Sequence, residues 1–278
     1  TVRRILTADQ SVQVTGTGYE PEGEFRSDDQ VVEPGPVVFE LLRAAVLASD
    51  ASLVESDGIW EIRGDPTEGA LVVAAVKAGL DAGNLRREAP RIWEIPFESE
   101  TKRMTTGHRF DGGSMAYVKG APEVVLAACD RCLTGSGEQV LEAELRERIR
   151  QAVSGMAEDA LRVIAVARKE AAEPGQVGQG LVLLGMAGML DPPRETARRA
   201  VELCRSAVIR PVMITGDHPL TASYIAREIG ITEDDKYLTG KELSKLSVKE
   251  LEEQVLDVSV YARVSPEHKM KLIDALQD

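Results

Sequence analysis

The chain has 278 residues, of which 43% are hydrophobic, and 33 Lys and Arg against 46 Asp and Glu give a formal net charge of −13. At about 150 residues per domain this length allows about two domains. The negative charge repels phosphodiester backbones and argues against general nucleic-acid binding, although it allows a local basic pocket. Three cysteines form no disulfide framework. Composition therefore predicts a soluble chain of a reducing compartment, with no signal peptide and no bilayer-spanning segment.

The first part of the chain mixes helical and strand periodicity, which predicts an α+β domain. Residues 16–36, rich in Gly, Pro, Asp and Glu, predict a solvated loop or a hairpin connection. The predicted helices cover residues 37–48, 66–78, 121–128 and 142–158, and the predicted strands cover residues 11–15, 92–97, 104–106, 114–119, 161–167 and 182–189.

After residue 191 the pattern changes to alternating helices and strands. The predicted helices cover residues 195–206, 220–229, 248–256 and 266–276, and the predicted strands cover residues 210–214 and 258–262. Alternation with apolar strands implies a parallel sheet covered on both faces. We therefore place a domain boundary near residues 185–191.

Thr215-Gly216-Asp217 follows a predicted strand directly, and ligands of open α/β sheets sit at the carboxyl ends of strands. A Thr hydroxyl and the N–H groups of a Gly turn suit a phosphate. The alternative is an ordinary strand-to-helix turn in which Asp217 caps the helix that follows. Lys269 comes one turn into a helix after the next strand, where it could neutralise a phosphoryl group or be merely solvated.

Two further segments place polar groups beside apparent ligand positions. Lys119-Gly-Ala-Pro-Glu puts a strand-ending lysine before a Pro-initiated helix, as in an anion-facing turn. The second pairs the polar Gly64–Glu68 stretch with Ile95-Pro-Phe97. The Phe97 ring could stack an adenine or belong to the core. Cys129 and Cys132 have redox-motif spacing but no second pair, which favours structural cysteines over a zinc site.

The order of these motifs carries more information than any one of them. Together they resemble the cytoplasmic part of P-type ATPases, most closely the type II branch that holds the calcium pumps, over nearly the whole chain. The motifs are Gly64-Asp-Pro-Thr-Glu68, Pro96-Phe97 with Lys102-Arg103-Met104, Lys119-Gly-Ala-Pro-Glu123, Leu161-Arg162, Asp191-Pro-Pro-Arg194, Thr215-Gly-Asp217 and Ala262-Arg-Val-Ser-Pro-Glu-His-Lys269.

The resemblance implies roles for five residues in a nucleotide-binding (N) domain. Phe97 matches the adenine-stacking aromatic, and Glu68 matches the acidic residue near the adenine amino group. Lys119 matches the pocket lysine, and Lys102 matches a second basic residue beside the nucleotide. Arg162 matches the arginine that reaches the phosphates. Ser99 stands where muscle-type calcium pumps carry an arginine, which bears on how tightly the triphosphate is held.

In the phosphorylation (P) domain the resemblance implies that Thr215, Gly216 and Asp217 lie near the transferred phosphate. Lys269 matches the lysine that neutralises the phosphoryl group, and Arg263 belongs to the same motif. The family's nucleophile lies in Asp-Lys-Thr-Gly-Thr, and a Gly-Asp-Gly-Val-Asn-Asp motif helps to hold Mg²⁺. Neither string occurs in this sequence.

We therefore expect α/β and α+β architecture. Residues 1–188 would be the N domain, an antiparallel sheet with flanking helices whose first few residues belong to the hinge. Residues 189–278 would be a partial, haloacid-dehalogenase-like Rossmannoid P domain. The chain is expected to be monomeric, to bind ATP weakly and not to turn it over.

In the complete pump, Mg²⁺ and the transmembrane and actuator domains of the same chain would act with this fragment at the cytoplasmic face of a membrane. Calcium is the first expectation for the transported cation. Two alternatives remain open from the residues alone. One is a soluble haloacid-dehalogenase-type phosphatase, which needs the missing nucleophilic Asp, and the other is a non-catalytic nucleotide-binding module.

Overall fold

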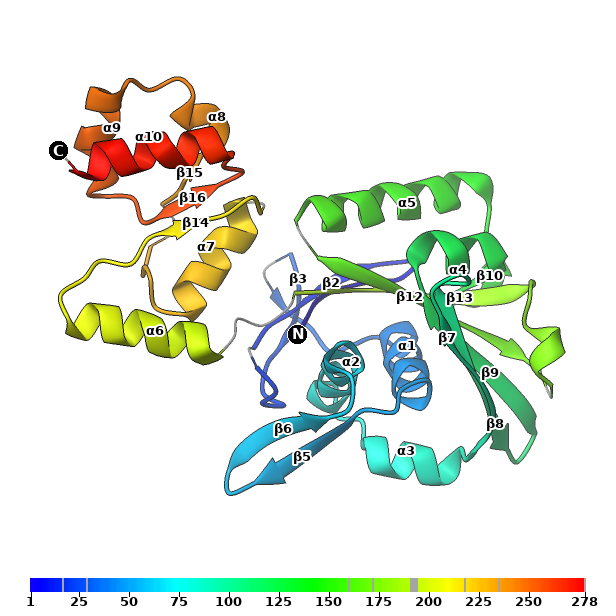
Figure 1. Ribbon diagram of the computed structural model, residues 1–278. Helices are drawn as coiled ribbons and strands as arrows, with labels where there is room; N and C mark the ends of the chain where they lie inside the picture. The colour runs from blue at the N-terminus through cyan, green and yellow to red at the C-terminus, as the bar shows by residue number, and fades with distance from the viewer. Residues whose placement is uncertain are drawn as a thin grey trace. The chain divides into compact units, whose positions relative to one another are not determined.

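The chain divides into two compact units in the computed structural model (Figure 1). The first comprises Thr1–Ala157 and Leu161–Leu190, and the second comprises Glu158–Ala160 and Asp191–Asp278. The structure describes residues 1–16, 18–28, 30–159, 161–171, 173–190, 195–217, 219–234 and 236–277. Among the described helices, none combines the length and the apolar character that a bilayer crossing requires.

The first unit is built on an eleven-stranded sheet whose main path runs β4-β3-β2-β1-β13-β12-β9-β8-β7 with antiparallel pairing throughout. The β10–β11 hairpin joins it through a parallel pairing of β10 with β13. The strands are β1 Val2–Leu6, β2 Ser11–Val14, β3 Phe25–Ser27, β4 Gln30–Val31, β7 Arg91–Glu98, β8 Arg103–Phe110, β9 Gly113–Gly120, β10 Cys129–Thr134, β11 Gly137–Val140, β12 Arg162–Glu170 and β13 Leu181–Met189. The expected antiparallel sheet is therefore confirmed.

Helices cover both faces of this sheet (Figure 1). α1 (Pro36–Leu47), α2 (Pro66–Lys77) and α3 (Ala82–Glu88) lie on one face, and α4 (Pro122–Ala128) and α5 (Ala143–Glu158) lie on the other. Side chains alternate between the faces along a strand, as the pleat requires. On β9, for example, Tyr117 packs into the core under α1 and α2, whereas Val118 packs into the core with α4.

Residues 16–36, expected as a solvated loop or a hairpin connection, hold the short antiparallel strands β3 and β4. Elsewhere in the first unit, α3 and the β10–β11 hairpin were missed. A separate hairpin, β5 (Ser52–Ser56) with β6 (Ile59–Arg63), was missed as well. Its turn has left-handed backbone at Asp57 (φ 54°) and Gly58 (φ 77°), the Asp-Gly signature of a two-residue hairpin.

The second unit contains a three-stranded parallel sheet of order β14-β16-β15, formed by Met213–Ile214, Val260–Ala262 and Leu238–Thr239. Tyr261 packs with residues of α8, α9 and α10, while Val260 and Ala262 pack with α7. The expected parallel sheet with cover on both faces is present. The helices are α6 Glu195–Ser206, α7 Pro219–Glu228, α8 Gly240–Leu243, α9 Val248–Val255 and α10 Pro266–Gln277.

Gly185 sets a tight approach in the middle of the large sheet. It lies on the fully buried strand β13, opposite an irregularity in the β12 register, with φ +147°. A Cβ at this position would lie 2.2 Å from the Leu6 carbonyl oxygen of β1. Only glycine fits this backbone and this spacing without distortion.

We therefore expect Gly185→Ala to lower the unfolding free energy of the first unit by about 2–3 kcal/mol, because it adds both backbone strain and a steric clash. The measurement is urea unfolding followed by tryptophan fluorescence, since Trp60 and Trp93 are the chain's two tryptophans and both lie in the first unit. The control is Gly112→Ala in the β8–β9 turn, where a Cβ meets nothing within 4 Å. Equal losses in both variants would contradict the assignment.

Candidate functional site

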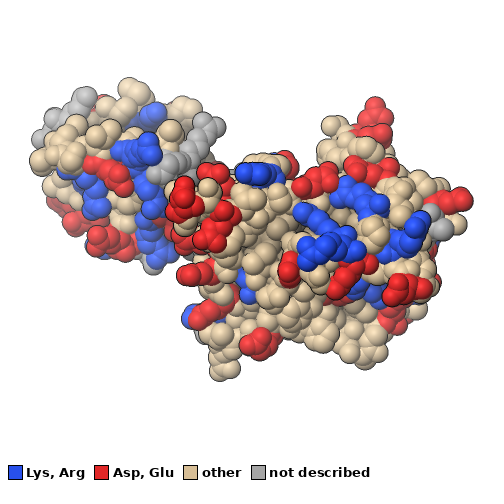
Figure 2. Space-filling view, turned by 90° about the horizontal axis from the view of Figure 1, so that it is seen from below, with Lys and Arg blue, Asp and Glu red and all other residues tan. Residues whose placement is uncertain are grey.

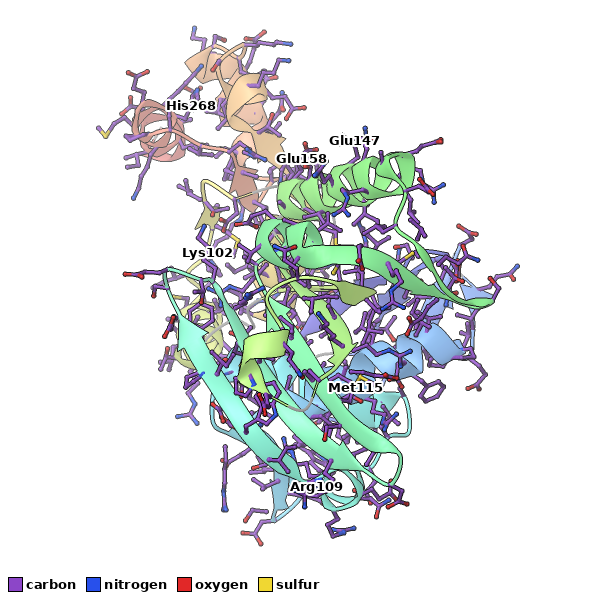
Figure 3. All side chains as sticks on the ribbon, turned by 90° about the vertical axis from the view of Figure 1, so that its right-hand side faces the viewer. Lys102, Arg109, Met115, Glu147, Glu158 and His268 are labelled. Carbon is purple, nitrogen blue, oxygen red and sulfur yellow. The ribbon has the colours of Figure 1, made fainter. Side chains whose placement is uncertain are left out.

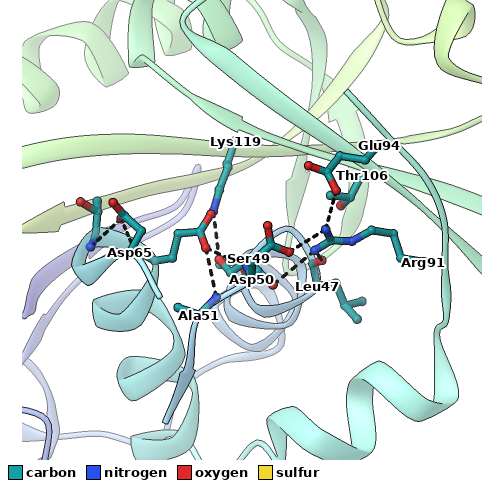
Figure 4. Close-up of polar contacts among 12 residues, drawn as sticks. Leu47, Ser49, Asp50, Ala51, Asp65, Arg91, Glu94, Thr106 and Lys119 are labelled. Carbon is teal, nitrogen blue, oxygen red and sulfur yellow. Dashed lines mark hydrogen bonds and ion pairs between the residues drawn. The ribbon is translucent and has the colours of Figure 1, made fainter. Parts of the chain in front are cut away.

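A buried ion pair lies between the sheet and the helices of the first unit. Lys119, near the end of β9, points from the sheet toward Ser49 (Figure 4). Its Nζ donates to Glu68 Oε1 at 2.5 Å and to Ser49 Oγ at 3.0 Å. The two charged side chains are only 7% and 15% exposed. A charged pair this buried is costly to desolvate and needs further hydrogen bonds to be tolerated.

Glu68 obtains those hydrogen bonds from the turn that follows α1. Its Oε2 accepts from the backbone N–H groups of Asp50 (2.7 Å) and Ala51 (3.1 Å). Ser49 Oγ in turn donates to the Ala45 carbonyl oxygen at 2.7 Å, so it is free to accept from Lys119. The pair is therefore embedded in a network that fixes the positions of both charged groups.

The Gly64–Glu68 segment has a structural reason for most of its residues. Asp65 caps α2 by accepting from the N–H groups of Thr67 (2.8 Å) and Glu68 (3.1 Å), and Pro66 begins the helix. Gly64 has φ +112°, and a Cβ there would lie 2.9 Å from Ala51 Cα. Together these residues place the Glu68 carboxylate in the first turn of α2, against the turn after α1.

Burial dominates the electrostatics of Lys119. Desolvation lowers the pKa of its ammonium group below the ordinary value, while the Glu68 carboxylate and, more weakly, Asp50 and Asp65 oppose that shift. A lysine with these neighbours offers donors of fixed direction instead of a mobile, solvated charge. Such a group can select a ligand by position as well as by sign.

Phe97 and Lys102 lie at the same end of the sheet as Lys119. The register aligns Glu98 with Arg103, and Arg103 with Gly120, so the β7–β8 turn stands beside the end of β9. Lys102 lies in that turn (Figure 3), in left-handed backbone (φ 49°), and its carbonyl oxygen accepts from Ala121 N at 2.9 Å. A Cβ at Gly120 would come within 2.4 Å of that oxygen.

Phe97 and Lys102, at this end of the sheet, are both exposed to solvent, unlike Lys119 and Glu68. The Phe97 ring is 60% exposed, so the alternative of a core phenylalanine is wrong. Lys102 Nζ lies 3.4 Å from Glu123 Oε1, and both side chains are largely exposed. An exposed aromatic ring and an exposed ammonium at the same end of the sheet as the buried carboxylate–lysine pair form a surface that suits a planar, anionic ligand.

Arg162 reaches the same region from the first residue of β12. Its Nη1 donates to Thr67 Oγ1 at 3.1 Å, one residue before Glu68. The Arg162–Thr67 contact therefore lies next in the chain to the network that Glu68 forms with Lys119 and Ser49. Ser49 was missed from the sequence because its role comes from a contact 70 residues away, for which a polar residue after a helix gives no signal.

In the second unit the loops after β14 and β16 are joined by backbone hydrogen bonds. Val264 N donates to the Thr215 carbonyl oxygen (3.1 Å), and Arg263 N donates to that of Asp217 (3.2 Å). Thr215 Oγ1 donates to Asp217 Oδ2 at 2.8 Å. The two predicted phosphate motifs, including the exposed Gly216, therefore lie together at the carboxyl edge of the parallel sheet.

Lys269 lies in the first turn of α10 with its side chain exposed, and its N–H donates to the Ser265 carbonyl oxygen at 3.3 Å. Its neighbour His268 closes that turn: Nδ1 accepts from Ser265 N at 3.1 Å, and Nε2 lies 2.7 Å from Ser244 Oγ. His268 was not predicted to take part. Arg263 has left-handed backbone (φ 54°), and its carbonyl oxygen would lie 2.3 Å from a Cβ on Gly240.

The remaining sequence candidates fall into two groups. The Asp191–Arg194 motif and His218 lie outside the described residues. Cys129 and Cys132 are buried in the core, where desolvation raises the pKa of both thiols, that of Cys129 to about 12. Within the described part of the chain, no group of three or more His, Cys, Asp or Glu residues could hold a metal ion.

We expect Glu68→Gln to lower the unfolding free energy of the first unit by about 2–3 kcal/mol, because it leaves the buried Lys119 ammonium without its counter-charge. Urea unfolding by tryptophan fluorescence measures the effect. The matched control is Glu123→Gln, which breaks the exposed pair with Lys102 and should cost less than about 0.5 kcal/mol. Adding Lys119→Met to Glu68→Gln should recover stability. A Glu68→Gln variant as stable as Glu123→Gln would show that the pair contributes nothing.

Comparison with known proteins gives a family for this chain. The family model described as P-type ATPase, cytoplasmic domain N matches residues 38–196. The chain is 38% identical, over its full length, to 32% of the cation-transporting ATPase pma1 of Synechocystis. It is 36% identical, again over its full length, to 32% of a calcium-transporting ATPase of Bacillus subtilis. A probable cation-transporting ATPase F of Mycobacterium tuberculosis is 37% identical with the same coverage.

The chain thus spans about a third of the length of these relatives. The matched residues 38–196 contain the whole Glu68–Lys119 network, Phe97, Lys102 and Arg162. The sequence motifs, the antiparallel sheet with its flanking helices and the family match agree. This chain belongs to the P-type ATPases and carries their cytoplasmic domain N.

Proposed function

We propose that the first unit binds ATP at the end of the sheet formed by Glu68, Phe97, Lys102, Lys119 and Arg162. The observation that carries this proposal is the buried Lys119–Glu68 pair, held by Ser49 and two backbone N–H groups beside an exposed aromatic ring. Fixed charges in a partly dry site cost little reorganisation when a ligand arrives.

Each part of the nucleotide has a counterpart in this surface. The exposed Phe97 ring offers a face on which adenine stacks. The Glu68 carboxylate accepts from the adenine amino group, and Lys119 fixes the orientation of the base. Lys102 and Arg162 supply positive charge toward the phosphates. The Lys102 side chain is largely exposed, and Arg162 begins β12 and contacts Thr67.

For the second unit we propose a partial, haloacid-dehalogenase-like phosphorylation domain covering residues 189–278, with residues 1–188 as the N domain and its hinge. Support comes from the parallel sheet and from the hydrogen bonds that join the Thr215–Asp217 loop to Arg263 and Val264. Thr215, Gly216 and Asp217 would face the transferred phosphate, and Lys269 would neutralise its charge.

In the whole protein this chain would deliver the γ-phosphate of ATP to an aspartate and so drive cation transport. Several relatives, those of Bacillus subtilis and Lactococcus lactis among them, are named as calcium-transporting ATPases, which makes calcium the first candidate cation. The chain would lie at the cytoplasmic face of the membrane, with transmembrane and actuator domains as its partners. The described residues offer no cluster for Mg²⁺, so we assign that ion to the nucleotide and to parts of the pump outside this sequence.

Titration of ATP into the chain should give weak binding, with a dissociation constant of about 0.1–1 mM, or roughly 4–5.5 kcal/mol. Phe97→Ala and Lys119→Ala should each weaken binding at least several-fold, because one removes the stacking face and the other a fixed donor. Isothermal titration with and without Mg²⁺ measures this, and only a mild dependence on Mg²⁺ is expected.

The control for Phe97→Ala is Val140→Ala on β11, since Val140 is similarly exposed (64% against 60%) but lies outside the site. Circular dichroism of each variant checks the fold. Affinities unchanged in both site variants would refute the pocket, and a strong requirement for Mg²⁺ would mean that the metal site is misassigned.

Incubation of the chain with γ-³²P-labelled ATP should leave no acid-stable, hydroxylamine-sensitive label. The sequence holds no Asp-Lys-Thr-Gly-Thr string, and a carboxylate nucleophile is what forms the covalent intermediate. The readout is label on the protein band after an acidic gel. Labelling sensitive to hydroxylamine would overturn the proposal that this chain binds ATP without turning it over.

A further inference from the structure

The turn that follows α1 is held from two opposite sides. Toward the sheet, Asp50 N and Ala51 N donate to Glu68, and Ser49 Oγ accepts from Lys119. On the other side lie the guanidinium groups of Arg86, from α3, and Arg91, from the first residue of β7. Neither arginine belongs to a sequence motif of the chain.

The two arginines bind the main chain of the turn. Arg86 Nη2 donates to the carbonyl oxygens of Ser49 (3.1 Å) and Ala51 (2.7 Å). Arg91 Nη2 donates to those of Leu47 and Ser49, both at 3.3 Å, and its Nη1 donates to Asp50 Oδ1 at 2.7 Å (Figure 4). The Leu47 carbonyl is the last of α1, where it has no partner within the helix and carries partial negative charge, and the carbonyls of Ser49 and Ala51 lie in the turn that follows.

One peptide unit links the two sides. The Ser49 carbonyl and the Asp50 N–H belong to the same planar trans peptide, so they point in opposite directions. Arg86 and Arg91 hold the oxygen, and Glu68 receives the N–H. A rotation of this peptide that moved its N–H off Glu68 would also break its bonds to the guanidinium groups.

We propose that Arg86 and Arg91 are positioning residues for nucleotide recognition: they clamp the turn Ser49–Ala51 and thereby fix the Glu68 carboxylate and the Lys119 ammonium. This inference rests on the proposed ATP site. The arginines act through the peptide, not on the ligand, because their guanidinium nitrogens face oxygens of the turn. The two arginines also line a surface pocket of about 280 Å³ with Leu47, Ala89 and His108.

Nucleotide selectivity provides the decisive readout. A fixed Glu68 carboxylate accepts from the amino group on C6 of adenine and would face the exocyclic carbonyl oxygen that guanine carries on C6, so it favours ATP over GTP. Loosening the turn should narrow this preference. A variant that merely unfolds part of the sample reduces the apparent binding of both nucleotides equally.

The experiment compares ATP and GTP titrations for the 278-residue chain and its Arg86→Met, Arg86→Lys and Arg87→Met variants. Arg87 is the matched control, since it is the exposed neighbour of Arg86 on α3, loses the same charge and donates to Asn84 Oδ1 at 3.2 Å. Figure 2 shows Lys and Arg interspersed with Asp and Glu on the face it presents.

We expect Arg86→Met to weaken ATP binding about three- to ten-fold, to narrow the ATP preference and to speed amide exchange at Asp50 and Ala51. That range corresponds to about 0.7–1.4 kcal/mol. Arg86→Lys should resemble Arg86→Met, because an ammonium group keeps the charge but lacks the fork. Arg87→Met should resemble the unmodified chain.

The outcomes separate this inference from the proposed function. If the unmodified chain binds ATP and Glu68→Gln narrows the preference while Arg86→Met does not, the clamp is overturned and the ATP site stands. Equal losses of ATP affinity in Arg86→Met and Arg87→Met would also overturn the clamp, and so would an ATP affinity of Arg86→Lys equal to that of the unmodified chain. In either case charge alone would explain the effect. Absence of ATP binding by the unmodified chain would overturn both.

Discussion

The buried contact between Lys119 and Glu68 is the constraint on which the rest of the first unit depends. Taking both charges from water is unfavourable unless each is fully hydrogen-bonded, and here the necessary partners come from three separate elements. β9 must keep its register with β8, α1 must end where Ser49 can reach the lysine, and α2 must begin at Pro66, capped by Asp65. The network therefore links the packing of the sheet to the geometry of the candidate site.

In the second unit, backbone hydrogen bonds and not a buried ion pair fix the positions of the candidate residues. Its candidate residues come from two loops far apart in the sequence, and hydrogen bonds between those loops align them at one sheet edge. The main chains of the exposed Lys269 and Arg263 are held by the capped first turn of α10 and by a left-handed residue against Gly240. In the proposed function, the exposed cations of the second unit would meet a phosphate, whereas the buried pair of the first unit would meet a planar base.

Local signals in the sequence predicted the regular elements well and the contacts between them poorly. The Pro66 start of α2, the apolar period of α1 and the parallel sheet could be read from residue patterns, and the order of the motifs identified the family. The Asp57-Gly58 turn was readable and was missed. Ser49, Arg86 and Arg91 could not be predicted, because their roles arise from contacts across 35 to 70 residues, and nothing in their local sequence distinguishes them from solvated side chains.

The number of hydrogen bonds that the Glu68 carboxylate already accepts determines how it can recognise a ligand. A carboxylate offers about four acceptor positions, and in this structure Lys119, Asp50 N and Ala51 N use three of them. In the proposed complex the base would therefore meet one remaining position whose direction is already set. Such a site discriminates between bases by geometry, since a base that presents an oxygen at this position finds no donor there. The base that does donate gains little binding energy, because it makes only a single hydrogen bond. A base held by one directed hydrogen bond and one stacking face would bind weakly and selectively, as the proposed ATP site requires.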